Sequence, residues 1–205
     1  LTSAKEAKEF ADELSTIVKT LDISSADMEK GMMRVEANIS LSQSANRRSL
    51  GTKVEIKNLN SFKAAERAIE YEIERQTEIL ASGKKVVQET RGWDDEKEIT
   101  VSQRIKEEAR DYRYFPEPDL PALDLEKYEE FNSEKLKAEL PETPEQMRIR
   151  LKKQYKLEDE LIEILVKDPQ ILSFFEKAVS ELLEWAKEEK DKQKLIELAA
   201  NYLKP

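Results

Sequence analysis

Residues 34–60, RVEANISLSQSANRRSLGTKVEIKNLN, contain the pattern that decides the fold of this chain. Residues 34–41 alternate between polar and apolar side chains, and residues 53–57 do the same. Because successive side chains of a strand point to opposite faces, each run predicts a strand with one polar and one apolar face. The Ser- and Asn-rich connection closes on Gly51 and predicts an antiparallel hairpin, so the two polar faces lie side by side.

The polar faces of this hairpin gather two carboxylates, Glu36 and Glu55, with the amide of Asn38 and the cations Arg34 and Lys57. One interpretation is an ordinary sheet, with one face on a core and the other in water. The other is a charged floor around a bound ion or phosphate. Paired carboxylates suit Mg²⁺, which takes oxygen ligands and usually keeps waters and substrate phosphates in its shell. The chain has no His and no Cys, so zinc and softer metals lack their preferred ligands.

Composition limits the possible functions. The 205 residues are 39 % charged and 39 % apolar, which indicates a well-solvated protein with enough residues for one or two cores. The net charge of −9 argues against a broad nucleic-acid-binding face, so any RNA contact must be local. No apolar run is long enough to span a bilayer and no signal-peptide pattern opens the chain, so we expect a cytoplasmic protein with no membrane partner.

Helical patterns flank the hairpin, over about residues 4–20 and 62–82, and the second is expected to end at Gly83. Residues 86–91 and 98–104 then predict a second hairpin. Its first strand alternates Gln88 and Thr90 with Glu89 and Arg91, and the sequence leaves open which pair extends the polar face. The four glycines are all expected at breaks between elements.

Residues 109–123, ARDYRYFPEPDLPAL, combine three aromatic residues with three prolines. Proline denies the chain helical and central-strand hydrogen bonds, so this segment is predicted to be extended. It is either a surface linker or, because of its rings and Arg113, a segment that docks into a groove. Beyond residue 124 the pattern is helical, with N-caps predicted at Thr143 and Asp168, each followed by proline.

The strings GMMRVEANIS, GTKVEIKNLNSF, AIEYEIERQTEIL, VVQETR and DYRYFPEPDLP, in this order, closely resemble the B subunits of the tRNA-dependent aspartyl/glutamyl-tRNA amidotransferases. The resemblance runs over residues 1–205 and implies an α+β fold. Residues 1–123 would be the C-terminal part of a cradle domain with an antiparallel sheet and helices, and residues 124–205 the start of an all-α helical domain. It also implies a fragment that lacks the N-terminal half of the cradle and the C-terminal tail domain. The direct passage from Leu123 into helices favours the B subunit over the related E subunit.

The resemblance also implies an activity. In the family, the cradle uses ATP and Mg²⁺ to phosphorylate the side-chain carboxylate of Glu or Asp misattached to tRNA(Gln) or tRNA(Asn). Ammonia, which the amidase (the A subunit) derives from glutamine, then displaces the phosphate, and a small protein, the C subunit, clasps the other two together. The implied partners are therefore the A and C subunits and the misacylated tRNA, and the implied co-substrate is ATP.

Matching the family strings residue by residue implies roles for seven side chains. Glu55 stands where the family has an acidic metal-site residue. Glu36 stands where the family usually has Asp, and its extra methylene changes its reach toward an ion. Both are expected to be catalytic and to bind the metal. Five more side chains match the strings and are expected to orient substrate, or else to form a hydrogen-bond network that shapes the site: Arg34, Asn38, Lys57, Asn58 and Asn60.

Two functions from different classes follow from these residues. The first is a component of the amidotransferase kinase site, inactive in isolation because further ligands are missing. The second is a non-catalytic RNA-binding or scaffold module of a larger assembly, in which the polar hairpin is a salt-bridged surface. The first requires the carboxyl groups of Glu36 and Glu55 to converge on one surface within reach of one shared cation.

Overall fold

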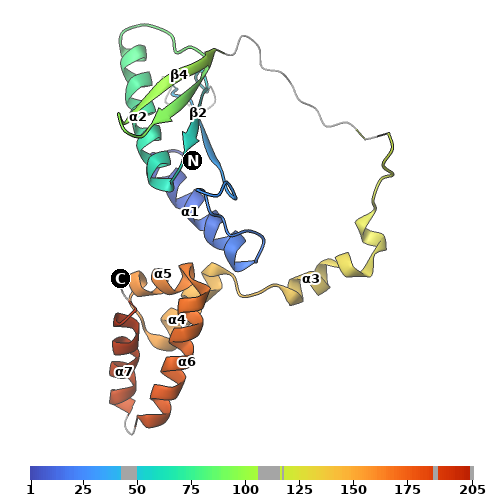
Figure 1. Ribbon diagram of the computed structural model, residues 1–205, viewed down its shortest axis with the longest axis vertical. Helices are drawn as coiled ribbons and strands as arrows, with labels where there is room; N and C mark the ends of the chain where they lie inside the picture. The colour runs from blue at the N-terminus through green and yellow to red at the C-terminus, as the bar shows by residue number, and fades with distance from the viewer. Residues whose placement is uncertain (43–49, 106–115, 117, 187–188, 204–205) are drawn as a thin grey trace. The chain divides into compact units, whose positions relative to one another are not determined.

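The computed structural model describes residues 1–42, 50–105, 116, 118–186 and 189–203 (Figure 1). These residues form two compact units, residues 1–15 with 24–131 and residues 16–23 with 132–205. The first unit contains the sheet and the second is helical. The predicted α+β class is therefore confirmed, whereas the domain limits of 1–123 and 124–205 stay a prediction.

The sheet of the first unit has four strands in the order β1-β2-β3-β4, formed by Val35–Ile39, Val54–Leu59, Glu89–Asp94 and Ile99–Ile105. Strands β1 and β2 pair antiparallel, as do β3 and β4, so both predicted hairpins are present. The central strands β2 and β3 pair parallel, which the prediction of an antiparallel sheet did not include. The reason is that the chain returns through helix α2, Phe62–Ala81, before it starts β3, and such a crossover joins parallel strands.

Helix α2 covers one face of the sheet (Figure 1). It begins at the N-cap Ser61, whose hydroxyl accepts a hydrogen bond from the Ala64 amide. Small residues of α2 let the helix approach the strands closely. The buried core between them comprises Ala4, Ile39, Ile56, Leu59, Ala64, Ala65, Ala68, Ile69 and Trp93. Helix α1 spans Ala4–Thr20, as the sequence predicted.

The second hairpin begins later than predicted. Strand β3 starts at Glu89 instead of residue 86, and it runs through Gly92 to Asp94. The expectation that every glycine marks a break is therefore wrong for Gly92. A Cβ built on Gly92 would lie 2.2 Å from Nε2 of Gln103, so the missing side chain makes room for that amide above the strand.

Gly51 closes the first hairpin by direct contact with the backbone. A Cβ at this position would lie 1.9 Å from the carbonyl oxygen of Leu41. We expect Gly51→Ala to lower the free energy of unfolding by about 1–3 kcal/mol, because the backbone must move to admit one methyl group. Gly92→Ala is the matched control, since its methyl meets only the ends of the Gln103 and Asn58 side chains. Urea unfolding of both variants should show the smaller loss for Gly92→Ala; equal losses would contradict the argument.

The second unit is helical, as predicted. Its principal helices are α4 Pro144–Tyr155, α5 Asp159–Lys167, α6 Pro169–Trp185 and α7 Glu189–Asn201. Thr143 and Asp168 are the N-caps of α4 and α6, again as predicted. The core of this unit centres on Phe175, whose ring packs edge-on against Tyr155 with centroids 5.3 Å apart.

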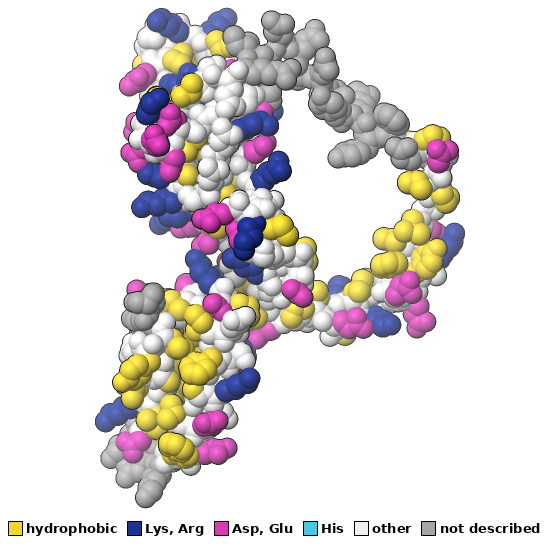
Figure 2. All heavy atoms as spheres, in the orientation of Figure 1, with side chains coloured by type: hydrophobic (Ala, Val, Ile, Leu, Met, Phe, Trp, Pro, Cys, Tyr) yellow, Lys and Arg dark blue, Asp and Glu magenta, His cyan; other side chains and the backbone are white. Residues whose placement is uncertain are grey.

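Between the sheet and these helices the chain forms the 3₁₀ turns Leu125–Lys127 and Glu129–Phe131 and the short helix α3, Ser133–Glu139. Apolar side chains over residues 118–140, including Leu120, Leu123 and Leu140, are exposed. Figure 2 shows yellow, apolar side chains over this part of the chain. The predicted docking motif DYRYF lies outside the described residues. Among the helices of the described ranges, none has the length and hydropathy to cross a membrane.

Candidate functional site

The face of the sheet turned away from α2 carries a polar floor, which we define as Glu36, Asn38, Glu55, Lys57 and Thr90. Alternation along β1 and β2 sends the apolar side chains to α2 and these polar side chains to the other face. Asn38 is the register partner of Glu55 on β1, and Thr90 is its partner on β3. Three strands therefore contribute to the floor, with Glu55 at its centre.

A β-bulge in β2 places two residues opposite Glu36. The pairs Val35–Leu59 and Ala37–Ile56 leave Lys57 and Asn58 facing this single residue of β1. Asn58 adopts a positive φ of 63°, a conformation that Asn tolerates better than most residues. The extra residue returns Leu59 to the core side and keeps Lys57 on the floor.

Lys57 joins the two carboxylates. Its Nζ lies 3.4 Å from Oε1 of Glu36 and 3.5 Å from Oε1 of Glu55. The hydrogen bond to Glu36 and the negative charges of Glu55 and Glu36 raise the pKa of Lys57 above its ordinary value. Glu36 and Glu55 therefore lie on one face and share the ammonium group of Lys57, while a metal ion between them stays a prediction.

Glu55 is held more firmly than Glu36. The hydroxyl of Thr90 donates a hydrogen bond of 3.1 Å to Oε2 of Glu55, while Oε1 faces Lys57. The side chain of Glu55 is 14 % exposed, against 46 % for Glu36. Thr90 thus settles which alternation of β3 extends the polar floor: Gln88 precedes the strand, and Glu89 and Arg91 turn toward α2.

The other predicted site residues lie around this centre. Arg34 directly precedes β1 and Asn60 directly follows β2, so both flank the Val35–Leu59 pair at one end of the hairpin. Asn58 lies in the bulge, with its amide near Gly92. The ion pairs join Glu36, Glu55 and Lys57, three of the seven predicted residues, and Asn38 lies beside them in register.

The oxygen atoms of the polar floor are of the chemical type that a hard divalent cation binds. Carboxylate oxygens of Glu36 and Glu55 and the amide oxygen of Asn38 are ligands that Mg²⁺ accepts, and Mg²⁺ commonly binds through one or two carboxylates while keeping waters. Over the ranges that the structure describes, no three Asp or Glu side chains converge into a metal-holding cluster. The floor therefore offers two carboxylates, and a bound ion would complete its shell with water, phosphate or groups from elsewhere.

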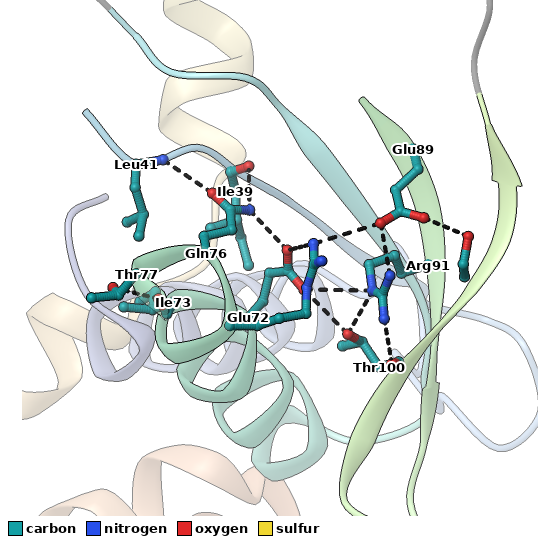
Figure 3. A network of polar contacts seen from close by, with 11 residues as sticks. Ile39, Leu41, Glu72, Ile73, Gln76, Thr77, Glu89, Arg91 and Thr100 are labelled. Carbon is teal, nitrogen blue, oxygen red and sulfur yellow. Dashed lines mark hydrogen bonds and ion pairs between the residues drawn. The ribbon is translucent and has the colours of Figure 1, made fainter. Parts of the chain in front are cut away.

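The opposite face of the sheet holds a buried network of charges that the sequence patterns did not indicate (Figure 3). Glu72 of α2 is 0 % exposed, and its carboxylate accepts hydrogen bonds from Arg75, Gln76 and Thr100. Arg91 of β3 lies 3.7 Å from Glu72 and donates to the hydroxyl and carbonyl oxygens of Thr100. The network thus ties α2 to strands β3 and β4.

Two more groups complete this network. Glu89 accepts a hydrogen bond of 2.7 Å from Nη1 of Arg91 and another from the hydroxyl of Ser102. Gln76 donates to the Ile39 carbonyl and accepts from the Leu41 amide, so its side-chain amide extends the hydrogen bonding at the end of β1. Glu89 and Arg91 flank Thr90 on β3, so the network fixes the strand that presents Thr90 to Glu55.

Glu89 makes the stability of the first unit pH-dependent. Burial alone would raise the pKa of Glu89, but the hydrogen bonds from Ser102 and Arg91 outweigh burial and lower it below its ordinary value of 4.5. The unfolded chain therefore binds the proton more readily, and stability is lost as pH falls from 4.5 through the lowered folded pKa. Urea unfolding between pH 3 and 6 should show that the free energy of unfolding falls toward acid pH. Glu89→Gln should make this fall with pH less steep. An equally steep fall in the variant would contradict the assignment to Glu89.

On the face of the first unit that Figure 2 shows, charged side chains do not segregate by sign. Figure 2 shows Lys and Arg side chains interspersed with Asp and Glu over the visible face of this unit. Such mixing gives no continuous basic track on that face for a nucleic-acid backbone.

Comparison with known proteins points to one family. Residues 1–130 match the family described as the GatB/GatE catalytic domain. The chain is also similar to curated proteins named as the B subunit of aspartyl/glutamyl-tRNA(Asn/Gln) amidotransferase. It is 44 % identical to that of Trichodesmium erythraeum over 180 residues, and 47 % identical to that of Persephonella marina over 180 residues.

These matches cover 88 % of this chain but only 36 % and 37 % of the two relatives, so the chain spans about a third of their length. The family match includes β1 to β4, α2 and all seven predicted site residues. By this match over more than half of its length, the chain belongs to the GatB/GatE catalytic domain family.

Proposed function

We propose that this chain supplies part of the kinase site of a tRNA-dependent amidotransferase. That site would use ATP to phosphorylate the side-chain carboxylate of Glu-tRNA(Gln) or Asp-tRNA(Asn), and glutamine-derived ammonia would then displace the phosphate. The observation that carries the proposal is the convergence of Glu36 and Glu55 around one cation on the exposed face of the sheet. The names of the relatives support the amidotransferase assignment.

Phosphoryl transfer depends on positioning and charge neutralisation more than on covalent chemistry by the protein. Glu55 and Glu36 would hold Mg²⁺, which when bound neutralises charge on the transferring phosphate. Thr90 keeps one oxygen of Glu55 engaged and so fixes the orientation of the carboxylate. Arg34, Asn58 and Asn60 at one end of the hairpin, with Asn38 and Lys57 on the polar floor, would bind ATP or the aminoacyl end.

The proposed partners are the amidase and the small protein of the complex, its A and C subunits, together with the misacylated tRNA. Two carboxylates cannot fill all the coordination positions of a bound metal ion. We therefore propose that the remainder of a complete B subunit provides further ligands. The mixed charges of the first unit suit a tRNA contact that is local instead of extended.

The experiment is an ADP-release assay on a complete B subunit that contains this sequence, assembled with the A and C subunits. We expect ADP formation to require both Mg²⁺ and misacylated tRNA, and to be lost when Glu55 is replaced by Gln. A non-catalytic scaffold is the second candidate, because Lys57 already forms ion pairs with both carboxylates in the structure. Turnover that is indifferent to the Glu55 substitution would favour the scaffold.

A further inference from the structure

Lys57 places its ammonium group where the proposed function requires a divalent cation. Its distances to Glu36 and Glu55, 3.4 and 3.5 Å, both exceed the roughly 2.7–2.9 Å of a tight ionic hydrogen bond. The ammonium group is thus shared between two carboxylates and bound closely by neither. Its side chain is 39 % exposed, so it has direct access to solvent.

We infer that Lys57 is an exchangeable internal cation, which offsets part of the negative charge of Glu36 and Glu55 in the metal-free protein and moves away when a divalent cation binds. This inference rests on the proposed function and assigns Lys57 a second role besides contact with substrate. It predicts that Lys57 competes with the metal, although it lies within the metal site.

The argument for exchange is electrostatic. A divalent ion bound to the facing oxygens of Glu36 and Glu55 would stand within a few ångströms of the Lys57 ammonium, and like charges at that distance repel strongly. The Lys side chain can relieve this repulsion, because its four-carbon stem rotates freely compared with the planar fork of Arg. Glu55 is less free to move, because Thr90 holds its other carboxylate oxygen and its side chain is 14 % exposed.

Lys57 can move toward solvent, because its side chain is 39 % exposed. Its register partner on β3 is Gly92, which has no side chain. The groups that lie over Gly92 are the neutral amides of Gln103 and Asn58. Within the described part of the sheet, the ion pairs of Lys57 are those with Glu36 and Glu55, so a metal that takes over these carboxylates releases Lys57.

A fixed structural role for Lys57 predicts the opposite behaviour. If the ammonium group served only to hold the two carboxylates together, its removal would let them separate and metal affinity would fall. If it competes with the metal, its removal raises metal affinity. The sign of the change therefore separates the two roles without an activity measurement.

The test is a calorimetric titration of a complete B subunit that contains this sequence, with Mn²⁺ as the probe, comparing wild type with Lys57→Met. We expect Lys57→Met to bind Mn²⁺ roughly tenfold more tightly, because one competing positive charge is gone. Lys63→Met is the matched control, since Lys63 is exposed on α2, which covers the opposite face, and its loss changes the net charge equally. It should stay within about twofold of wild type, as expected for distant screened charges.

Each result decides the question. Tighter binding by Lys57→Met than by Lys63→Met, abolished when Glu55→Gln is added, supports exchange. Mn²⁺ binding that is unchanged or weaker in Lys57→Met overturns the exchange role while the proposed metal site stands. Absence of Mn²⁺ binding by every variant would overturn the proposed metal site of this chain, and the inference with it.

Discussion

Replacing Glu55 by Gln is expected to lower ADP formation by the assembled amidotransferase roughly 100-fold or more, the largest loss of any single change on the polar floor. Charge neutralisation by a bound metal contributes several kcal/mol to the transition state, and an amide in place of this carboxylate weakens the metal's attachment. Glu55 is central because it is paired with Asn38, Thr90 and Lys57 and is the less exposed of the two carboxylates.

Glu36→Gln should cost less, about tenfold, because Glu36 is the more exposed and the less firmly held of the two carboxylates. Glu36 lies on β1, at the edge of the described sheet, and its side chain is 46 % exposed. The measurement is ADP release with saturating misacylated tRNA. Glu70→Gln, an exposed position on α2, is the matched control and should retain activity within about twofold.

The relative activity losses of Glu55→Gln and Glu36→Gln show where the centre of the site lies. If Glu36→Gln lost more activity than Glu55→Gln, the centre of the site would lie at the β1 edge. If both behaved like Glu70→Gln, the polar floor would be a salt-bridged surface, as in the scaffold alternative.

The second large effect concerns the buried network. We expect Glu72→Ala to lower the free energy of unfolding of the first unit by about 3–5 kcal/mol, because removal of one partner leaves buried charges uncompensated. Arg75 and Arg91 both direct guanidinium groups at Glu72, and Thr100 and Gln76 lose an acceptor. Glu74→Ala is the control on the same helix, and at this exposed position the change should stay within about 0.5 kcal/mol.

The chain offers a clean probe for this measurement. Its two tryptophans are Trp93, which is 6 % exposed in the core of the first unit, and Trp185, which is 77 % exposed on α6. In a Trp185→Phe background, urea unfolding followed by fluorescence reports on Trp93 alone.

A double variant tests whether charge pairing is the cause. Glu72→Met combined with Arg91→Met removes both charges and should recover part of the lost free energy of unfolding. A double variant as unstable as the sum of the single variants would contradict charge pairing as the cause.

The alternation of residues 34–41 and 53–57 correctly predicted the hairpin and placed Glu36 and Glu55 on one face, because side-chain parity follows from strand geometry alone. The bulge was missed, although the three-residue step from Ile56 to Leu59 breaks the alternation and Asn58 is a residue that accepts positive φ. Thr90 could not be chosen over Arg91 from sequence, since both alternations of β3 carry polar side chains.

The buried network was missed for a different physical reason. Glu72 and Arg91 occupy positions that face the core, where a sequence pattern favours apolar residues, and only their mutual contacts make burial tolerable. Those contacts join α2 to strands that follow it in the chain and cannot be seen in local spacing. The parallel pairing of β2 with β3 had a visible signal, a strand, a helix and a strand in succession, which is typical of a crossover.

That crossover has a kinetic consequence. A two-stranded hairpin is marginally stable by itself in water, and the apolar side of β1 and β2 is covered only after α2 has folded back. Thr90 arrives later still, since it must pair with Glu55 across a separation of 35 residues. The two carboxylates are therefore brought together by one hairpin, yet their fixed geometry should emerge in one late, cooperative step, when β3 pairs with β2 after the α2 crossover.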